Sequence, residues 1–364
     1  MPVKVGVIGC GKVAQRLHIP QYINAENMEI EGGPSRLLWL CETPVDAEIV
    51  ALCDAREDVI KRIAGKIGVK KTFTDYKELL KDDTIEAVSI CTPNYLHAEM
   101  TIAAANAGKH VLVEKPMATS LPEAEAMVEA AHKNKVILMV EQTHRFGPNP
   151  EIAKEVLNEG SLGRILYIWG RIGHAGPEQW SPGADWYIQK KTGGGGAMMC
   201  IGIHIFDFIR WLLRKEAVEI SGNLGPLRKP YFEVESYGNA HVLFEDGTIG
   251  AFEASWSNRP YQMIAILYGE KGTMTVSFND EVPVLVKYGM PPDVGDPNCG
   301  WGELVPYKRD KSIYGGPIAH FINCIKRKEQ PIVPGEEGLK SLEGIMAIYE
   351  SVKTGKFVKL PLKK

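Results

Sequence analysis

Two patterns of apolar and polar residues follow one another along the chain. Over residues 1–142, short apolar runs alternate with stretches in which apolar residues recur every three or four positions. The runs predict buried strands, and the longer spacing predicts amphipathic helices. We expect strands at Val3–Gly9, Glu48–Asp54, Ala87–Pro93, His110–Pro116 and Val136–Gln142, and helices at Lys12–Ala25, Arg56–Ile67, Leu96–Ala107 and Leu121–Asn134. This alternation predicts an α/β domain over residues 1–142, built on a doubly wound parallel sheet.

After residue 142 the alternation of strands with helices stops. Apolar and polar residues now alternate one by one, which predicts strands with one buried face. The predicted strands are Tyr237–Phe244, Ile249–Trp256, Gln262–Tyr268 and Thr273–Phe278, and the predicted helices are Asn149–Gly160 and Ala197–Leu213. Tight turns at residues 245–248 and 269–272 would join strands as hairpins. Residues 143–364 are therefore expected to form an α+β domain with a large, mostly antiparallel open sheet. Stretches rich in glycine or proline, Glu31–Pro44 and Gly289–Gly302, predict surface loops.

Charge and composition argue against several classes of partner. The net charge over 364 residues is -3, which gives no electrostatic basis for binding nucleic acid or an anionic membrane surface. No apolar run approaches the roughly 20 residues of a membrane span, and the opening residues show no targeting segment, so a cytoplasmic protein is expected. The seven cysteines are scattered without a C-x-x-C pair, which predicts free thiols and no metal site.

Residues 9–14, GCGKVA, fit the pattern G-x-G-x-x-A between a predicted strand and a predicted helix. The first glycine allows a tight turn, the second lets a pyrophosphate approach the backbone, and the small Ala14 lets helix and strand pack closely. The helix start also offers free N–H groups and the positive end of its dipole to phosphates. The segment predicts a dinucleotide-binding loop. Its expected contacts with the cofactor are Gly9, Gly11, Lys12 and Val13.

An acid at the end of the second strand reads the adenosine ribose of a dinucleotide. Glu31 has the usual spacing from Gly11, whereas Asp54 ends the apolar run EIVALCD. We favour Asp54 because the surroundings of Glu31 do not resemble a strand, and we treat Asn27–Asp46 as an insertion. A carboxylate at this position binds a ribose diol and repels a 2′-phosphate, which favours NAD over NADP. Arg56 would offset part of that repulsion.

Polar residues follow the next two predicted strands. Lys115 stands in the segment HVLVEKP, residues 110–116, and Thr92-Pro93-Asn94 ends the strand before it. Doubly wound sheets bind their ligands at the carboxyl ends of parallel strands, so Lys115 is a candidate ligand-facing residue. A surface Glu–Lys pair at a strand exit is the alternative that this fragment leaves open.

Four glycines, residues 193–196, open onto an apolar helical pattern whose polar side chains are Cys200, His204 and Asp207. Their spacing would place all three on one helical face. The three could form a metal site or a thiol nucleophile with its base, and a buried core histidine is the alternative interpretation of His204. A zinc site is not expected, because two ligands on one helix fall short of a zinc set and no other Cys/His pair supports them.

Taken together, these motifs resemble those of the Gfo/Idh/MocA oxidoreductases. The matching segments are GCGKVA at 9–14, TPNYLH at 92–97, EKP at 114–116, HRFGP at 144–148, GGGG…GIHIFD at 193–207 and GLKSLEGIMAIYESVKTGKFVKL at 338–360. The resemblance implies a nicotinamide-binding Rossmann domain and a C-terminal domain whose sheet carries the substrate pocket and often the oligomer contact. It also implies oxidation or reduction of a sugar or cyclitol hydroxyl. A homodimer or homotetramer is therefore expected.

The resemblance assigns roles to individual residues. Lys115 would polarise the substrate hydroxyl, and His204 would carry the proton. The expected cofactor contacts beyond the glycine-rich loop are Asp54, Thr92, Pro93, Asn94, His97, Glu114, Lys115 and Arg145. The expected substrate contacts are Lys115, His174, Asp185, Trp186, Tyr187, Cys200 and His204.

Cys200 departs from the family pattern, which usually has an aspartate four residues before this histidine. A thiol is a weak hydrogen-bonding group and supplies no charge unless it is ionised. Cys200 is interpreted first as a small packed hydrophobe, with Asp185 or Asp207 supporting His204. It is interpreted second as tuning a site in which Lys115 alone relays the proton, and third as a metal ligand or nucleophile. We favour the first interpretation.

The leading hypothesis from the sequence is an NAD(H)-dependent dehydrogenase or reductase of a sugar, sugar derivative or cyclitol. A second is an enzyme that keeps its nicotinamide bound and shows no net redox change, as some glycosidases and isomerases do. A third is a sugar or nucleotide sensor without catalysis. The intact EKP segment and His204 favour an enzyme over a sensor.

Overall fold

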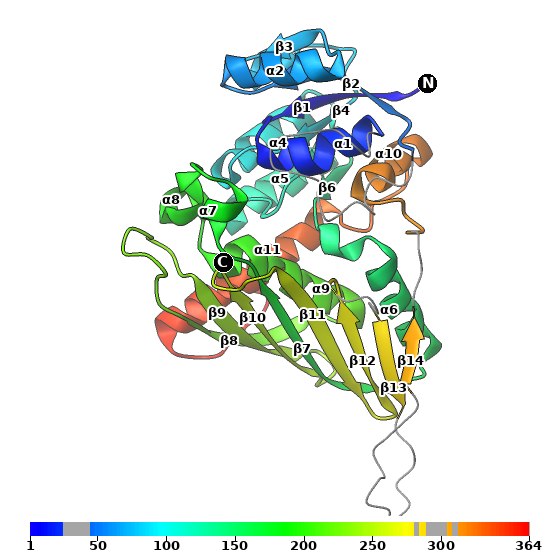
Figure 1. The fold of residues 1–364 in the computed structure, drawn as a ribbon, viewed down its shortest axis with the longest axis vertical. Helices are drawn as coiled ribbons and strands as arrows, with labels where there is room; N and C mark the ends of the chain where they lie inside the picture. Colours follow the sequence, from blue (N-terminus) through cyan, green and yellow to red (C-terminus); the bar gives the residue numbers. More distant parts are fainter. Residues whose placement is uncertain (25–43, 280–283, 289–303, 308–311, 364) are drawn as a thin grey trace, which may run out of the picture. The chain divides into compact units, whose positions relative to one another are not determined.

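The computed structural model describes residues 1–24, 44–279, 284–288, 304–307 and 312–363, and the chain forms two compact units (Figure 1). Unit 1 consists of Met1–Gly147, Lys191–Gly194 and Lys311–Leu342, and unit 2 of Pro148–Lys190, Gly195–Asp310 and Glu343–Lys364. The sequence analysis placed a single boundary after residue 142. The segments interleave instead, because a late segment bonds to a strand of unit 1: the N–H of Val140 donates to the carbonyl of Val333 at 3.0 Å. The predicted loops Glu31–Pro44 and Gly289–Gly302 lie outside the described residues, apart from Pro44.

Unit 1 is built on a six-stranded parallel sheet. Its strands are β1 (Val3–Ile8), β2 (Ala47–Cys53), β3 (Lys71–Phe73), β4 (Ala87–Ile90), β5 (His110–Val113) and β6 (Leu138–Val140), in the order β3-β2-β1-β4-β5-β6. The order reverses between β1 and β4, and doubly wound sheets bind ligands at the carboxyl ends of the strands around such a point. A site in unit 1 is therefore expected at this edge.

Helices flank the sheet of unit 1. They are α1 (Ile19–Tyr22), α2 (Glu57–Ile67), α3 (Tyr76–Leu80), α4 (His97–Asn106), α5 (Leu121–Asn134) and α10 (Pro317–Arg327), and a π-helical turn, Ala14–His18, precedes α1. All strands and helices predicted over residues 1–142 are confirmed, with ends that differ by a few residues. The sequence analysis missed β3 and α3, because both are short and β3 has no apolar run.

Unit 2 is built on a nine-stranded sheet among the described residues. Its strands are β7 (Ile165–Gly173), β8 (Ala217–Leu224), β9 (Tyr237–Phe244), β10 (Ile249–Ser255), β11 (Gln262–Gly269), β12 (Gly272–Ser277), β13 (Val284–Tyr288), β14 (Leu304–Tyr307) and β15 (Val358–Lys359). Their order is β14-β13-β12-β11-β7-β10-β9-β8-β15, and every pairing is antiparallel except that of β10 with β7. The mostly antiparallel sheet and both predicted hairpins are thereby confirmed.

The remaining helices are α6 (Pro148–Glu159), α7 (Pro177–Trp180), α8 (Lys190–Gly193), α9 (Ile203–Leu213) and α11 (Gly335–Thr354), and a π-helical turn, Met198–Gly202, precedes α9. One helical segment of the described chain, Lys190–Leu213, is long and apolar enough to cross a membrane by length and composition. The sequence analysis did not single it out, because glycines and lysines interrupt its apolar residues. Of its most apolar window, 94% is buried inside the protein, as in a core helix.

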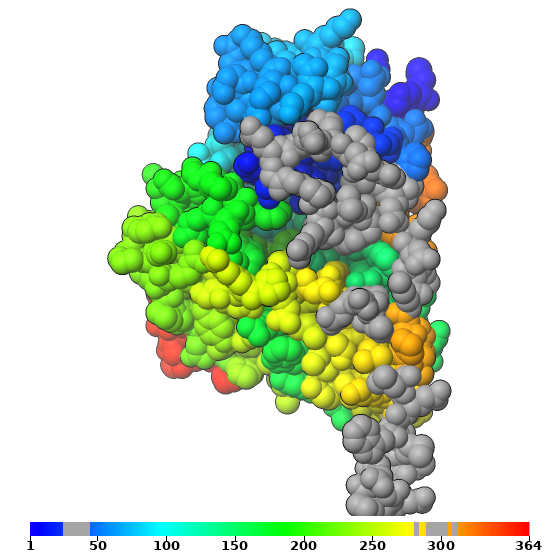
Figure 2. All heavy atoms as spheres, viewed as in Figure 1, coloured from blue at the N-terminus to red at the C-terminus, as the bar shows by residue number. Residues whose placement is uncertain are grey.

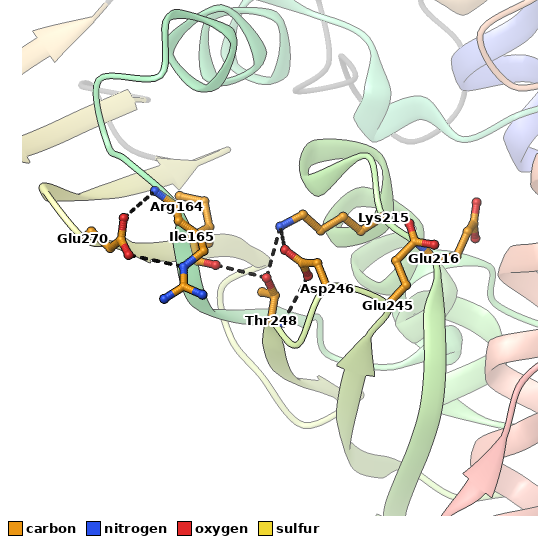
Figure 3. A network of polar contacts seen from close by, with 8 residues as sticks. All are labelled: Arg164, Ile165, Lys215, Glu216, Glu245, Asp246, Thr248 and Glu270. Atoms are coloured by element: carbon orange, nitrogen blue, oxygen red, sulfur yellow. Dashed lines mark hydrogen bonds and ion pairs between the residues drawn. The ribbon is translucent and has the colours of Figure 1, made fainter.

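Polar contacts tie the hairpin turns of unit 2 to neighbouring strands (Figure 3). Thr248 Oγ1 donates to a main-chain carbonyl at the start of β7 at 3.0 Å, and its N–H donates to Asp246 at 3.1 Å. Lys215, just before β8, forms an ion pair with Asp246 and donates to Thr248 Oγ1 at 3.1 Å. At the other turn, Arg164 Nε donates to Glu270 at 3.2 Å. These contacts hold the register of the hairpins.

Helices cover one face of the sheet of unit 2, and no helix of the described residues covers the opposite face, here called the open face (Figure 1). Gly170 of β7 makes room for α9, because an added Cβ would lie 2.7 Å from a side-chain carbon of Ile205. Alternate residues of β10 and β11 point to the open face, where Ile249 is 52% and Tyr268 41% exposed. Side chains of β11 and β12 (yellow) lie at the surface in Figure 2.

Candidate functional site

The glycine-rich loop joins β1 to the first helical turn of unit 1. Gly9 has φ +88°, and an added Cβ would lie 2.7 Å from the main chain at the end of β4, so no side chain fits there. At Gly11 an added Cβ would meet nothing within 4 Å, which leaves the backbone open to a ligand. Ala14 is fully buried between helix and sheet, and Lys12 and Val13 are half-buried at the helix start. The loop has the shape that a pyrophosphate requires.

Asp54 holds this loop from the end of β2. Its Oδ2 accepts the N–H of Cys10 at 2.8 Å, and its Oδ1 accepts the main-chain N–H and the Nε–H of Arg56, both at 3.0 Å. Burial opposes ionisation of Asp54, but the hydrogen bonds from Arg56 and Cys10 outweigh burial and lower the pKa of the carboxyl. Asp54 is therefore a carboxylate beside the loop, and the guanidinium that pairs with it is largely exposed.

His97, at the start of α4, links two loops at the sheet edge. Its Nδ1 lies 2.8 Å from the carbonyl of Pro116, and its Nε2 lies 2.8 Å from the carbonyl of Thr92. Burial outweighs these two contacts and lowers the pKa of the ring, which favours the neutral imidazole. The side chain is fully buried behind the loops. His97 therefore connects the two loops, and its predicted contact with the cofactor stays a prediction.

Glu114 fixes the backbone of the loop that carries Lys115. Its Oε1 lies 2.9 Å from Nε2 of His18, in the first helical turn, and its Oε2 accepts the N–H of Lys115 at 3.2 Å. Burial opposes the charge of this carboxylate, but His18 and Lys115 outweigh burial and lower its pKa. The sequence analysis missed His18, because a buried histidine within an apolar helix carries no pattern of its own.

Asn94, in the loop after β4, binds the first glycine of the run of four. Its Nδ2 donates to the carbonyl of Gly193 at 2.9 Å, and its side chain is buried. Thr92 and Pro93, just before it, are half-buried. An added Cβ at Gly194, where φ is +80°, would lie 3.3 Å from Thr119. The first half of the glycine run is therefore packed within unit 1.

Lys115 is half-buried among titratable groups. Its charge acts on Glu114, His97 and His144. Burial, assisted by the charge of Lys115, lowers the pKa of His144 to about 3, so this imidazole is neutral at neutral pH. The sequence analysis chose Arg145 from this segment, yet the structure brings its neighbour His144 within electrostatic reach of Lys115.

Arg145 has partners within unit 1 that give it a structural role. Its guanidinium donates to the carbonyl of Ile332 at 3.0 Å and to the carboxylate of Glu337 at 2.8 Å, and only 2% of the side chain is exposed. A buried guanidinium needs such partners, because an unpaired buried charge is costly. Arg145 therefore attaches the segment around Ile332 to the loop after β6, and its predicted contact with the cofactor stays a prediction.

Glu141 directly follows β6 and is 1% exposed. Burial, and next the charge of Glu114, raise the pKa of Glu141 well above its ordinary value. Its Oε2 has no hydrogen-bond partner among the described residues. These features describe a neutral carboxylic acid beside the end of β5, the strand that precedes Lys115. The sequence showed no pattern that would have identified it.

The other predicted substrate residues belong to unit 2. His174 follows β7, and its Nδ1 accepts a main-chain N–H two residues further on at 2.9 Å. Asp185, Trp186 and Tyr187 share one 3-10 helical turn, and the rings of Trp186 and Tyr187 stack with centroids 3.7 Å apart. The two rings are half-buried and Asp185 is exposed. The turn thus offers an aromatic surface beside a carboxylate.

Cys200, His204 and Asp207 are all buried in the helical segment after the glycines. The π-helical turn includes Cys200, and the regular α-helix begins only at Ile203. The three residues therefore do not share the one regular helix on which the single-face prediction rested. No group of three or more His, Cys, Asp or Glu in the described parts of the chain is arranged to hold a metal ion.

Five cysteines lie in the described residues, and all of them are buried and form no disulfide with one another: Cys10, Cys53, Cys91, Cys200 and Cys324. Cys41 and Cys299 lie outside the described residues. Burial, and then the charge of Asp54, raise the pKa of Cys10 to about 12, so its thiol is not ionised at neutral pH. It is therefore not poised as a nucleophile.

The strand order of unit 1, the open backbone at Gly11 and the carboxylate that ends β2 define a dinucleotide-binding protein of the Rossmann class. The chain belongs to the Gfo/Idh/MocA family of oxidoreductases. Residues 3–142 match the oxidoreductase family with an NAD-binding Rossmann fold, and residues 151–275 match the GFO/IDH/MocA C-terminal domain.

Relatives of known activity align with most of the chain. It is 28% identical to myo-inositol 2-dehydrogenase of Thermotoga maritima over 98% of both chains. It is 30% identical to scyllo-inositol 2-dehydrogenase (NAD(+)) of Bacillus subtilis, over 87% of this chain and 90% of the relative. The structure of aldose-aldose oxidoreductase from Caulobacter crescentus complexed with glycerol is similar with a TM-score of 0.81 and 25% identity, over 99% of this chain and 100% of that one.

Replacing Glu141 by glutamine should change how stability depends on pH. The folded protein keeps a proton on Glu141 that the unfolded chain releases above its ordinary pKa of 4.5, so this residue lowers the free energy of unfolding as pH rises. The glutamine variant should gain stability relative to the wild type by up to about 1.4 kcal/mol per pH unit between about pH 5 and pH 7. Urea unfolding of both proteins, with equal m-values, measures this; a difference that stays constant with pH would contradict it.

Proposed function

We propose that this chain is an NAD-dependent dehydrogenase or reductase that moves a hydride between nicotinamide and a secondary hydroxyl or carbonyl of a sugar, sugar derivative or cyclitol. The position of Lys115 carries the proposal. It stands half-buried at the carboxyl edge of a parallel sheet, on a backbone that Glu114 holds. The two inositol dehydrogenases among the relatives support the class of substrate.

The residues of unit 1 fit a nicotinamide dinucleotide. The open backbone at Gly11 and the N–H groups of the helical turn after it would hold the pyrophosphate, and Asp54 would accept hydrogen bonds from the ribose diol. The nicotinamide, once bound, supplies the acceptor for the hydride. Lys115 and the polar loops after β4 and β5 would face its reactive end.

The roles of the side chains follow from the chemistry of alcohol oxidation. Lys115 would donate a hydrogen bond to the substrate hydroxyl and stabilise the negative charge that develops on its oxygen. His204, as a buried imidazole, would accept the proton and carry it away. The stacked rings of Trp186 and Tyr187 would receive the apolar face of a sugar ring, and Asp185 would bind its hydroxyl groups.

The expected cofactor preference is for NAD over NADP. Asp54 is ionised and would repel a 2′-phosphate, while Arg56, paired with it, offsets part of the repulsion. The preference should therefore be moderate.

A homodimer or homotetramer through the open face of the sheet of unit 2 is part of the proposal. One cross-strand row on this face runs Leu243–Ile249–Tyr167–Tyr268, and the two tyrosine rings lie 5.7 Å apart. Covering such apolar side chains with a second sheet would remove them from water. The free, buried thiols suit a reducing cytoplasm, where we place the enzyme.

Lys115→Ala should abolish most of the dehydrogenase activity without preventing NADH binding. The variant loses the donor at the reacting oxygen and keeps the glycine-rich loop, so kcat should fall at least about a hundredfold. NADH absorbance over a panel of inositols, sugars and uronates measures turnover, and fluorescence titration measures NADH binding. Equal turnover by the variant would remove Lys115 from the mechanism.

Arg56→Ala should make the protein more selective for NAD. Without the guanidinium, the charge of Asp54 acts undiminished on a 2′-phosphate, so the ratio of the NADPH to the NADH dissociation constant should rise about threefold or more. Asp54→Asn is the matched control and should lower that ratio. An Arg56→Ala protein that binds NADPH as well as the wild type does would show that this pair does not set the preference.

A further inference from the structure

The helical segment that carries Cys200 and His204, the π-helical turn followed by α9, begins against a carboxylate from another part of unit 2. Glu235 lies just before β9 and is 7% exposed. Its two carboxylate oxygens lie 3.1 and 3.0 Å from the N–H of Gly196, and its Oε1 also accepts the N–H of Met198 at 3.0 Å. The main-chain carbonyl of Glu235 accepts the N–H of Ala197 at 2.9 Å. One residue therefore satisfies three consecutive N–H groups that the start of a helix leaves without internal partners.

The last two glycines of the run are explained by the same contacts. An added Cβ at Gly196 would lie 1.9 Å from the carbonyl oxygen of Glu235, and one at Gly195 would lie 2.1 Å from Tyr349 Oη. Tyr349, on α11, donates its hydroxyl to Glu235 Oε1 at 2.9 Å. No side chain fits at either position unless this pair moves. The glycines thus mark where a buried carboxylate and a phenol approach the backbone.

Burial and hydrogen bonds act on the charge of Glu235 in opposite directions. Burial outweighs its hydrogen bonds and raises the pKa of Glu235, while the N–H groups of Met198 and Gly196 and the hydroxyl of Tyr349 act in the opposite direction. Burial, and then Glu235 itself, raise the pKa of Tyr349 well above its ordinary value, so the phenol stays a donor. The carboxylate also faces the positive end of the helix dipole.

The direction of His204 depends on where this helix starts. The N–H of Cys200 already bonds to the carbonyl of Gly196 at 2.8 Å, and the π-helical turn over Met198–Gly202 leads directly into α9. A start displaced by one residue would rotate every following side chain by about 100°. Contacts that fix Gly196 and Met198 therefore fix the direction in which His204 points.

We propose that Glu235 is a positioning residue for the substrate site: it anchors the start of the helix through the main chain of the glycine run and thereby orients His204. The inference rests on the proposed role of His204. In this chain the residue that supports the helix is remote in sequence. In the family pattern an acid one turn before the histidine is expected to support it. Glu235 acts through the helix and does not touch the reacting atoms.

Three substitutions of Glu235 test the proposal. Glu235→Gln keeps Oε1, which accepts from Gly196, Met198 and Tyr349, so its kcat should stay within about threefold of the wild type. Glu235→Leu removes the acceptor, and its kcat should fall about ten- to hundredfold with unchanged NADH affinity. Glu235→Asp has a shorter side chain, and its kcat should lie between those of the other two variants. It also tests the proposal if the leucine variant does not fold. Lys229→Leu, at an exposed position six residues earlier on the same segment, is the control.

Two further measurements separate this inference from the proposed function. Amide hydrogen exchange at residues 196–198 should accelerate at least about tenfold in Glu235→Asp or Glu235→Leu and stay unchanged in Lys229→Leu. On a His204→Asn background, Glu235→Leu should cause no further loss of kcat, because both act through the same imidazole. Unchanged exchange, or losses that multiply, would overturn the anchoring role. Full activity of His204→Asn with accelerated exchange in the Glu235 variants would instead overturn the role of His204 and keep the anchor.

Discussion

Each segment that carries the proposed chemistry is held by one carboxylate, buried or half-buried, that accepts at least one main-chain N–H. Asp54 holds the glycine-rich loop, Glu114 holds the loop of Lys115, and Glu235 holds the start of the helix of His204. Segments rich in glycine bury little apolar side chain, so packing alone stabilises them weakly. Hydrogen bonds to a carboxylate are stronger than those between neutral groups. Because burying the carboxylate is costly, each of the three has two or more donors.

Apolar periodicity predicted the elements that bury a long apolar face. The strands β9 to β12 and the helix α5 could be read from the sequence, because their own residues alternate or recur with the period of the element. The edge strand β3, Lys71–Phe73, is polar and short, and it exists because it pairs with β2. The late helix α10 joins unit 1 through contacts between residues remote in sequence. Such contacts leave no local pattern.

In the candidate site, too, the sequence predicted some residues and gave no indication of others. Motifs placed Lys115 and Asp54 at strand ends, because a motif ties a residue type to a position in the fold. The groups that hold them or lie beneath them, His18 and Glu141 among them, showed no pattern, since folding alone decides which side chains meet a given backbone. The direction of Arg145 also depends on a remote partner, Glu337. The run of four glycines was the one feature of the sequence that indicated such a contact. A backbone without side chains marks a place where other groups approach it closely.

The movement of a hydrogen bound to carbon tests the account most directly. The polyol that the protein oxidises fastest would be deuterated at the carbon that bears the reacting hydroxyl and incubated with NAD⁺, and mass spectrometry would locate the deuterium. The account predicts that the deuterium appears on the nicotinamide ring in step with the product. Product that forms while the nicotinamide stays unlabelled and the deuterium enters water would contradict it.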